Sequence, residues 1–381
     1  MNGKTGVWQR LADDAVLYGD DRLIGLPAFR PRISLAGKIS LQLIDGIGLT
    51  VAKPDPQGAP GVAIEYGRLM AKAEEAGGGR LRFRFGDHGG LCRFADSDSV
   101  VALEVSRLDG AGADPETQPG PMVADLYVTS GKILWRDEPG GKEIPLNGPV
   151  RLSLGEQPLE PVALQQFPKW ASADTVAPLD QRAAGVLDRD LTLGRSVMLG
   201  LRELTDYRQR EVRWLAARSL SLAGDFAPLL RPLEEPDQSR FWNEYIEQLR
   251  AAVYRSPQSA AAVRTAMESR YGPQGATLYE MLWKYRPDTL QPEDANRLVG
   301  FLDHDMLPFR ILSFWNLKSI TGRTLYYRPE EAAAKRQTAI QKWRELLKVS
   351  PALRGIPPGS APAPAPAGQS SGEPPREAGE R

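Results

Sequence analysis

The stretch that decides the first half of the fold is GGGRLRFRFGDHGGLCRFADSDSVVALEVSR, at residues 77–107. Apolar and polar residues alternate in it, so that Leu81, Phe83 and Phe85 face one way and the arginines between them face the other. Gly and Asp residues, which are typical of turns, separate the alternating segments. The stretch therefore predicts three short β-strands.

Similar alternation occurs on both sides of this stretch, at residues 30–46, 61–73, 121–137 and 148–158. Gly37-Lys38 is a predicted turn between two of these strands, and Gly67 marks a predicted bulge or kink. We therefore predict an all-β domain, a sandwich or roll, over residues 5–165. The Pro/Gly/Asp-rich segment at residues 108–121 is predicted to be a loop too polar to pack.

The periodicity changes after a predicted linker at residues 166–177. From 178 to 349 apolar residues recur at i, i+3, i+4 and i+7, which predicts amphipathic helices separated by Pro- and Gly-containing breaks. Residues 352–381 are rich in Pro, Ala, Gly, Ser and Glu, which predicts a disordered tail. The expected fold is therefore multidomain, all-β followed by an α-helical array.

An internal match supports the helical array. With an offset of 97 residues and no gap, Leu201 aligns with Leu298, and Val212-Arg213 aligns with Phe309-Arg310. The offset is about two repeats of the roughly 40–47 residues that HEAT-like helix pairs span. A chance match between two amphipathic helices is the alternative.

The same alignment pairs Asp206 with Asp303 in the turns before the aligned arginines. We therefore predict that Arg213 and Arg310 bridge to carboxylates in these turns, with Asp206 and Asp303 as the candidates.

Near its start the chain resembles a FecR-type domain. The resemblance rests on an entry pattern of an aromatic residue, spaced apolar residues and a Gly-Asp turn, at Trp8, Leu11, Val16, Gly19-Asp20, Leu23, Pro27, Ile33, Leu35 and Leu43. A second segment, IEYGRLMAKA at residues 64–73, resembles the strand that carries an apolar-x-x-Gly-Arg-apolar core in such domains. The similarity covers roughly residues 5–107 and is built from core and turn residues.

Together with the HEAT-like array, this makes the chain similar to modular bacterial envelope proteins. The resemblance implies an extracytoplasmic binding or sensing module, normally tethered by an upstream transmembrane helix and sometimes placed behind a signalling domain such as a kinase. No run of about 18 apolar residues occurs in the sequence, so we expect no membrane span in this chain. We expect a periplasmic or extracytoplasmic location if an anchor precedes it, and a cytoplasmic one otherwise.

The amino-acid composition limits the kinds of binding and catalytic site that the chain can form. Lys plus Arg equals Asp plus Glu at 48 each, which argues against a dedicated nucleic-acid binder. Cys92 is the only cysteine, which excludes thiolate metal cages, and His88 and His304 are the only histidines. Asp87-His88 is interpreted as a turn and His304 as part of a turn between paired helices. We predict no catalytic residue, no metal site and no cofactor.

The candidate partner-binding residues are basic and aromatic: Arg208, Arg210, Trp242, Tyr245, Tyr326, Tyr327 and Arg328. Arg208 and Arg210 belong to an arginine-rich run whose interleaved acids also fit a salt-bridged surface. Trp242 and Tyr245 are candidate anchors if they are exposed. Tyr326, Tyr327 and Arg328 could hold a polyanion, or they could precede a structural helix that starts at Pro329 and caps the array.

The sequence therefore predicts a non-enzymatic protein-binding, sensing or scaffold module of the bacterial cell envelope, with a protein partner. It does not predict the oligomeric state. One alternative is a cytoplasmic scaffold or regulatory subunit. Another is a hydrolase that acts on envelope carbohydrate, which requires two carboxylates within about 10 Å in one cleft.

Overall fold

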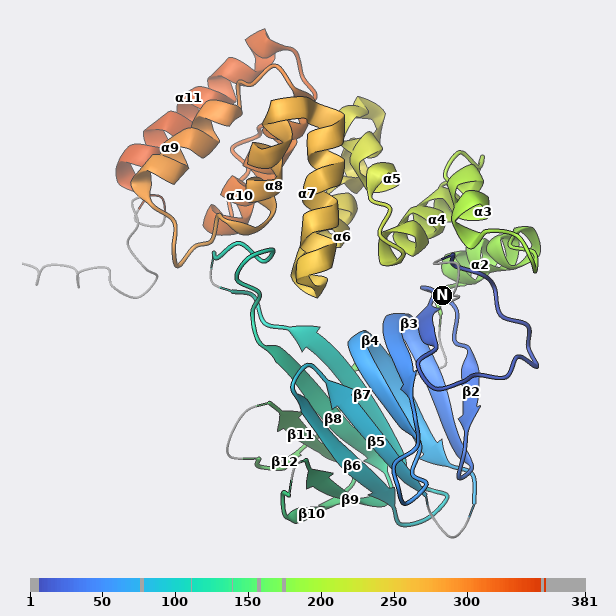
Figure 1. Cartoon of the computed structure of the whole chain (residues 1–381). Helices are drawn as coiled ribbons and strands as arrows, with labels where there is room; N and C mark the ends of the chain where they lie inside the picture. Colours follow the sequence, from blue (N-terminus) through green and yellow to red (C-terminus); the bar gives the residue numbers. More distant parts are fainter. Residues whose placement is uncertain are drawn as a thin grey trace, which may run out of the picture.

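A β domain is followed by a helical region, as the sequence predicts, in the computed structural model of the chain (Figure 1). The structure describes residues 7–75, 79–110, 112–138, 140–155, 159–172 and 176–350, together with Leu353. The predicted disordered tail at 352–381 lies outside the described residues except for Leu353. None of the described helices is both long and apolar enough to cross a membrane.

The described residues form one twelve-stranded sheet. Its strands are β1 (Arg22–Gly25), β2 (Arg32–Leu35), β3 (Ile39–Ala52), β4 (Gly61–Ala73), β5 (Arg80–Phe85), β6 (His88–Phe94), β7 (Val100–Arg107), β8 (Met122–Ser130), β9 (Lys132–Asp137), β10 (Glu143–Asn147), β11 (Val150–Leu154) and β12 (Val162–Ala163). The predicted strands at residues 77–107 correspond to β5, β6 and β7.

Strand β4 joins two halves of this sheet because it changes neighbours along its length. Its start, Gly61–Ala63, runs parallel to β5, whereas Gly67–Lys72 pairs antiparallel with β7. Strand β3 pairs with β4 on the other edge. One half continues as β5-β6-β9-β10 and the other as β7-β8-β11-β12, and both contribute to one apolar core. This arrangement is the rolled, sandwich-like sheet that the alternation predicts.

The inward residues of β5 behave as predicted. Leu81 and Phe83 are fully buried, and Phe85 is 2% exposed, while the arginines between them face away from the core. Cys92 on β6 is also fully buried. Because burial disfavours the thiolate, it raises the pKa of the Cys92 thiol far above its usual range. Cys92 is therefore a packing residue.

The predicted irregularity at Gly67 is a bulge between β3 and β4. The β3–β4 register shifts between Ile44 and Gly48, opposite Gly67. Gly67 has φ +103°, and a Cβ there would lie 2.7 Å from the carbonyl oxygen of Gly46. Only glycine fits this backbone without strain. The bulge turns Asp45 outward, toward the helical region.

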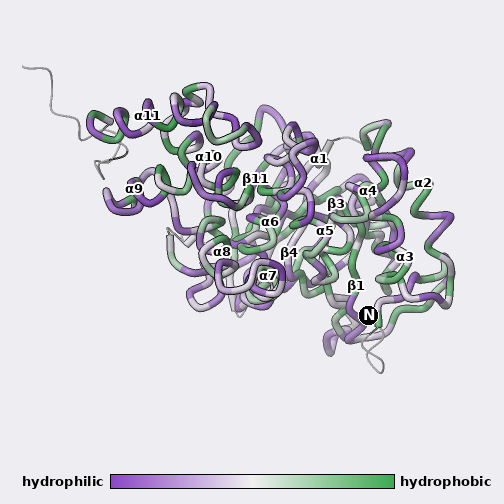
Figure 2. The backbone as a smooth tube through the Cα atoms, turned by 90° about the horizontal axis from the view of Figure 1, so that it is seen from above, coloured by the Kyte–Doolittle hydropathy of each residue, from purple (hydrophilic) through white to green (hydrophobic). Residues whose placement is uncertain are grey.

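The helices are α1 (Lys169–Ser172), α2 (Pro178–Asp190), α3 (Val197–Leu204), α4 (Arg210–Leu222), α5 (Ala227–Leu230), η1 (Arg231–Glu234), η2 (Pro236–Phe241), α6 (Trp242–Arg255), α7 (Pro257–Tyr271), η3 (Gly272–Gln274), α8 (Gly275–Trp283), α9 (Pro292–Phe301), α10 (Leu307–Thr321) and α11 (Ala333–Val349). Hydrophilic and hydrophobic segments alternate along them, as in amphipathic helices (Figure 2). Short helix α1, within the predicted linker, packs on the sheet at Ala102 and Tyr127.

The internal match corresponds to two equivalent helix pairs. The first helix of each pair ends at Leu204 or Phe301, and the second begins at Arg210 or Leu307; both differences, 301 minus 204 and 307 minus 210, equal 97. The aligned core residues Leu201 and Leu298 are both fully buried. The match is therefore a repeated helical hairpin of this chain.

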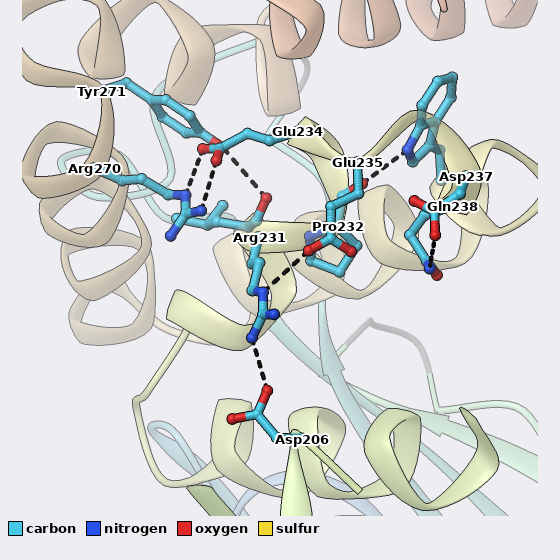
Figure 3. A network of polar contacts seen from close by, with 11 residues as sticks. Asp206, Arg231, Pro232, Glu234, Glu235, Asp237, Gln238, Arg270 and Tyr271 are labelled. Carbon is cyan, nitrogen blue, oxygen red and sulfur yellow. Dashed lines mark hydrogen bonds and ion pairs between the residues drawn. The ribbon is translucent and has the colours of Figure 1, made fainter. Parts of the chain in front are cut away.

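The predicted partners of the two aligned arginines are wrong. Asp206 instead pairs with Arg231 of η1 at 2.8 Å, as Figure 3 shows, and Asp303 lies 3.5 Å from Arg336. Arg213 and Arg310 donate to backbone carbonyl groups. These carbonyl groups lie in the turns between the paired helices, where no intrahelical donor satisfies them, so they accept from the guanidinium groups in place of the carboxylates.

The β3 bulge is one point at which the two regions meet. Arg218 of α4 contacts Asp45 at 3.2 Å. Beside this pair, the guanidinium of Arg255 lies over the ring of Tyr66, 4.8 Å from its centroid, and donates to the carbonyl oxygen of Ser221 at 2.8 Å. The bulge therefore serves as a docking point for the ends of α4 and α6.

The loop between β7 and β8 is a second contact, which Figure 1 shows reaching the helices. Tyr279 donates to Asp114 at 2.8 Å, and Arg264 contacts Glu116 at 3.3 Å. The prediction that residues 108–121 are too polar to pack is wrong. The acidic side chains of this loop find basic and hydroxyl partners on α7 and α8, which satisfies them without an apolar interface.

The N-terminal segment is a third contact. Leu26, Ala28 and Phe29 pack against the core formed by α2, α3 and α4. Arg10 pairs with Asp188 at 2.8 Å. Three contacts spread along the chain therefore hold the sheet against the helical region.

Candidate functional site

Three of the predicted aromatic site residues are buried. Trp242 and Tyr245 are each 5% exposed, and Tyr327 is 3% exposed. The indole of Trp242 donates to the carbonyl oxygen of Pro232 in η1 at 2.9 Å. Tyr245 packs edge-to-face on Trp214, with ring centroids 5.0 Å apart. The exposure that an anchor role requires is missing, and Tyr245 is a packing residue.

The arginine-rich run fits its structural alternative. Arg210 pairs with Glu244 at 2.6 Å and lies over the ring of Phe241 at 3.2 Å, so it fastens α4 to α6. Arg202 pairs with Asp225 at 2.7 Å. These contacts are typical of a salt-bridged surface. Arg208, which is exposed, makes no ion pair within the described residues.

The segment after α10 differs from its predicted form. Pro329 does not start a helix, because α11 begins at Ala333. The residues between them form a turn that is held by two arginines: Arg310 donates to the carbonyl oxygen of Pro329 at 2.8 Å, and Arg336 donates to that of Glu331 at 2.6 Å. The helix that follows caps the array as predicted, since its Trp343 is fully buried.

This turn closes one side of a groove of about 290 Å³, which we name the aromatic groove. Its other sides are the start of α6 with the end of η2, and one face of α10. The lining residues are Ser239, Arg240, Trp242, Asn243, Ile246, Ile311, Phe314, Trp315, Lys318, Tyr327, Arg328, Pro329 and Glu330. The predicted residues Trp242, Tyr327 and Arg328 thus meet here, whereas Tyr326, which is 88% exposed, is not among the lining residues.

The floor of the groove is apolar because of the spacing on α10. Ile311, Phe314, Trp315 and Lys318 follow the i, i+3, i+4, i+7 pattern, which places them on one helix face. Phe314 and Trp315 remain partly exposed because a turn follows α10 at this point in place of another helix. The Phe314 ring packs against Tyr327, with centroids 5.3 Å apart.

The rim of the groove is basic. Arg240, Lys318 and Arg328 are exposed there, and Glu330 is the one carboxylate among the lining residues. Arg328 reaches Glu331 only at 3.9 Å. In the part of the chain that the structure describes, Lys318 and Arg240 make no ion pair.

The buried tyrosine of the floor is fixed in its neutral form. The Tyr327 hydroxyl donates to the carbonyl oxygen of Leu302. Burial raises the pKa of Tyr327 well above its usual value, because the charged phenolate would lose its hydration. The floor is therefore a rigid apolar surface at neutral pH.

The two histidines and the two pockets are the candidate places for catalytic groups. His88 stacks on Phe85 at a β-turn, and His304 accepts a hydrogen bond from the Met306 amide at 3.0 Å between α9 and α10, in the turns that the sequence predicts. A second pocket of about 440 Å³, beside α9 and α11, is lined by no carboxylate. Neither pocket offers the facing pair of acids that the hydrolase alternative requires. The described residues hold no cluster of metal-ligating side chains.

Sequence signals identified only part of the aromatic groove. Tyr327 and Arg328 stand out in the sequence as an aromatic-basic segment, but Phe314, Trp315 and Lys318 were missed. Their spacing on α10 is that of an ordinary buried helix face. The absence of a helix over this face is a tertiary property.

Comparisons with solved structures give weak similarities. Two crystal structures of a "putative anti-sigma factor" from Parabacteroides distasonis, at 2.50 and 1.65 Å resolution, match with a TM-score of 0.26 and 10% sequence identity. The match covers 37% of this chain and 58% of that chain, so this chain spans less than two thirds of the protein it matches. A similarity at this level assigns neither a family nor a function. No protein-family model and no curated protein matches the chain.

Proposed function

We propose that this chain is a non-enzymatic protein-binding module that holds a segment of a partner protein in the aromatic groove. One observation carries the proposal: a concave apolar floor on well-packed helices has a rim of cations without strong partners. Concave, mostly apolar sites with a few polar groups are typical of ligand-binding surfaces.

The chemistry of the groove defines the class of partner segment. Phe314 and Trp315 offer an apolar surface for one aromatic or aliphatic side chain. Burial of such a side chain contributes about 1.5–3 kcal/mol, which makes it the anchor of the segment. Lys318 and Arg240 favour Asp or Glu residues beside the anchor, and they would raise the rate of association more than the final affinity.

The β domain would act as a rigid platform for the helices. Its three contacts with the helical region include charged pairs and the stacking of Arg255 on Tyr66, so the groove and the sheet would move as one unit. This supports a scaffold or sensing module in which binding at the groove is transmitted to the sheet.

We further propose the bacterial cell envelope as its location, on the resemblance of roughly residues 5–107 to FecR-type domains. A cytoplasmic scaffold or regulatory subunit is the alternative. Cell fractionation followed by detection with antibody against this chain decides between the two locations. Recovery in the cytoplasmic fraction alone excludes the envelope location.

Selection from a library of displayed short peptides tests the binding function. We expect enriched sequences to carry one large apolar residue next to Asp or Glu. Their affinity should fall about tenfold in the Lys318→Glu, Arg328→Glu double variant, because two of the three cations at the rim become anions. Lys335→Glu is the matched control, since Lys335 is exposed on α11 and does not line the groove. Equal losses in both variants would exclude the groove as the binding site.

A further inference from the structure

Five arginines gather on the outer surface of the sheet, far from the aromatic groove in sequence. Arg80, Arg82 and Arg84 alternate along β5 with the buried residues of that strand. Arg93 of β6 pairs with Arg80. Arg136 of β9 and Arg82 pair with the same residue of β6, one from each side, so they lie in one row across the three strands. We name this surface the arginine face.

Few carboxylates neutralise the arginine face. Glu143 contacts Arg93 at 3.1 Å. Asp55 lies near Arg80 and Arg82, and it accepts hydrogen bonds from the amides of Gln57 and Ala59.

A third carboxylate, Glu138, follows the end of β9. Within the described residues, Arg82, Arg84 and Arg136 make no ion pair, and Nε of Arg82 is buried without a hydrogen-bond partner. The arginine face therefore keeps cationic groups that its own chain does not satisfy.

Two of the residues between the arginines expose little or no side chain. Leu91 pairs with Arg82 on one side and Arg136 on the other, and it is only 8% exposed although it faces outward. The aliphatic stems of arginines cover apolar neighbours in this way. Gly89, which pairs with Arg84, adds no side chain. Neither of these two positions therefore places a bulky exposed side chain between the cationic groups.

The side chains of the arginine face indicate which class of anionic partner it suits. Its β5, β6 and β9 positions carry no outward aromatic side chain, so it lacks the stacking platform that single-stranded nucleic acids require. It also lacks exposed large apolar side chains that would enter a bilayer. An acidic protein segment needs neither of these features.

We propose that the arginine face binds an extended acidic segment of a partner protein, with carboxylates at alternate residues. Alternate residues of an extended chain are about 6.6–6.8 Å apart, in β5 and in the bound segment alike. A carboxylate at every second position therefore meets Arg82 and Arg84 in register. Arg80 continues the same spacing, but its guanidinium already donates to the side-chain and carbonyl oxygens of Gln57 at 2.9 and 2.8 Å. Arginine binds carboxylates with two parallel hydrogen bonds, which adds geometric selectivity to the charge attraction.

Two synthetic peptides of identical composition test this proposal with the full chain. In one peptide Glu and Ser alternate, and in the other all Glu residues precede all Ser residues. We expect the alternating peptide to bind about tenfold more tightly at low salt, because only its carboxylates match the spacing of the arginines. Equal affinity for the two peptides would contradict the proposal.

Substitutions locate the binding. Arg84→Glu with Arg136→Glu should weaken binding of the alternating peptide about tenfold. The matched control is Arg182→Glu with Arg189→Glu, which reverses two exposed charges on α2. Thermal unfolding of each variant monitors the fold, and the milder Arg84→Gln with Arg136→Gln variant should show a smaller loss in the same direction. Unchanged binding in both arginine-face variants overturns the proposal.

Two further probes test single-stranded nucleic acid and anionic membranes as alternative partners. Oligothymidylate, and phosphatidylcholine vesicles with about 30% phosphatidylserine, should bind more weakly than the alternating peptide at physiological salt. Tighter binding of either probe overturns the proposal. The Lys318→Glu, Arg328→Glu variant should keep full affinity for the alternating peptide, which separates this surface from the aromatic groove.

Discussion

Arg213 and Arg310 make the same contact in two helix pairs that lie 97 residues apart. Each donates from Nη1 to the carbonyl oxygens six and five positions earlier, at 2.9 and 3.2 Å for Arg213 and at 2.7 and 2.6 Å for Arg310. Each guanidinium thus caps the turn between the two helices of its hairpin. Arg310 also binds the carbonyl oxygen of Pro329 at 2.8 Å, which couples its hairpin to the turn of the aromatic groove.

Removal of these guanidinium groups should destabilise the fold. We expect Arg213→Ala to lower the free energy of unfolding by about 1–3 kcal/mol, since carbonyl groups lose charged donors. Arg310→Ala should cost more, because three carbonyl groups lose their donor. Arg208→Ala is the control and should change stability by less than about 0.5 kcal/mol. Urea unfolding measures all three, and losses no larger than the control would contradict the capping role.

The β3–β4 bulge should tolerate no side chain at Gly67. In Gly67→Ala the new Cβ would meet the Gly46 carbonyl oxygen at 2.7 Å, on a backbone with φ +103°. We expect a loss of about 2–4 kcal/mol of unfolding free energy, together with weaker docking of α4. Gly185→Ala is the matched control: it lies inside α2 with open space around its Cβ, and should gain about 0.5–1 kcal/mol. Calorimetry that shows the same sign for both variants would refute this account.

Coupling between the two regions can be measured across the Asp114–Tyr279 hydrogen bond. Tyr279→Phe and Asp114→Ala each remove one partner of the 2.8 Å contact. A double-mutant cycle should give a coupling energy of about 0.5–1.5 kcal/mol, because the hydrogen bond is lost only once. Purely additive effects on stability would show that the loop and α8 do not stabilise one another.

The buried tyrosines predict a loss of stability in alkali. Burial raises the pKa of Tyr127 and of Tyr285 to about 12. In the unfolded chain a tyrosine ionises near pH ~10, so its contribution is fully present below that pH and is lost as pH rises further. The expected cost is about 1 kcal/mol per buried tyrosine at pH ~11. Urea midpoints measured from neutral pH to pH ~11 should stay level and then fall. Ionisation of Tyr127 and Tyr285 themselves near pH ~10, without unfolding, would contradict this burial.

Sequence periodicity predicted those features that depend on neighbouring residues. Leu81 and Phe83 are buried because strand alternation is local, and Gly67 is a bulge because only glycine adopts its backbone angle. The second helices of the two pairs also begin 97 residues apart, which is the offset of the internal sequence match.

Features that depend on distant partners were missed. The change of neighbours along β4 and the docking of Asp114 both require contacts with remote segments. The exposure of Phe314 and Trp315 depends on which element covers α10. Periodicity assigns such residues to the core and gives no sign of an open groove.

The central claim is that a partner segment binds in the aromatic groove. Fluorine NMR of the full chain labelled with fluorotryptophan tests it directly, in the presence of a peptide selected by display. We predict that the Trp315 resonance shifts on binding, whereas that of Trp135, fully buried in the sheet, stays in place. A tight-binding peptide that leaves the Trp315 resonance unchanged would contradict the claim.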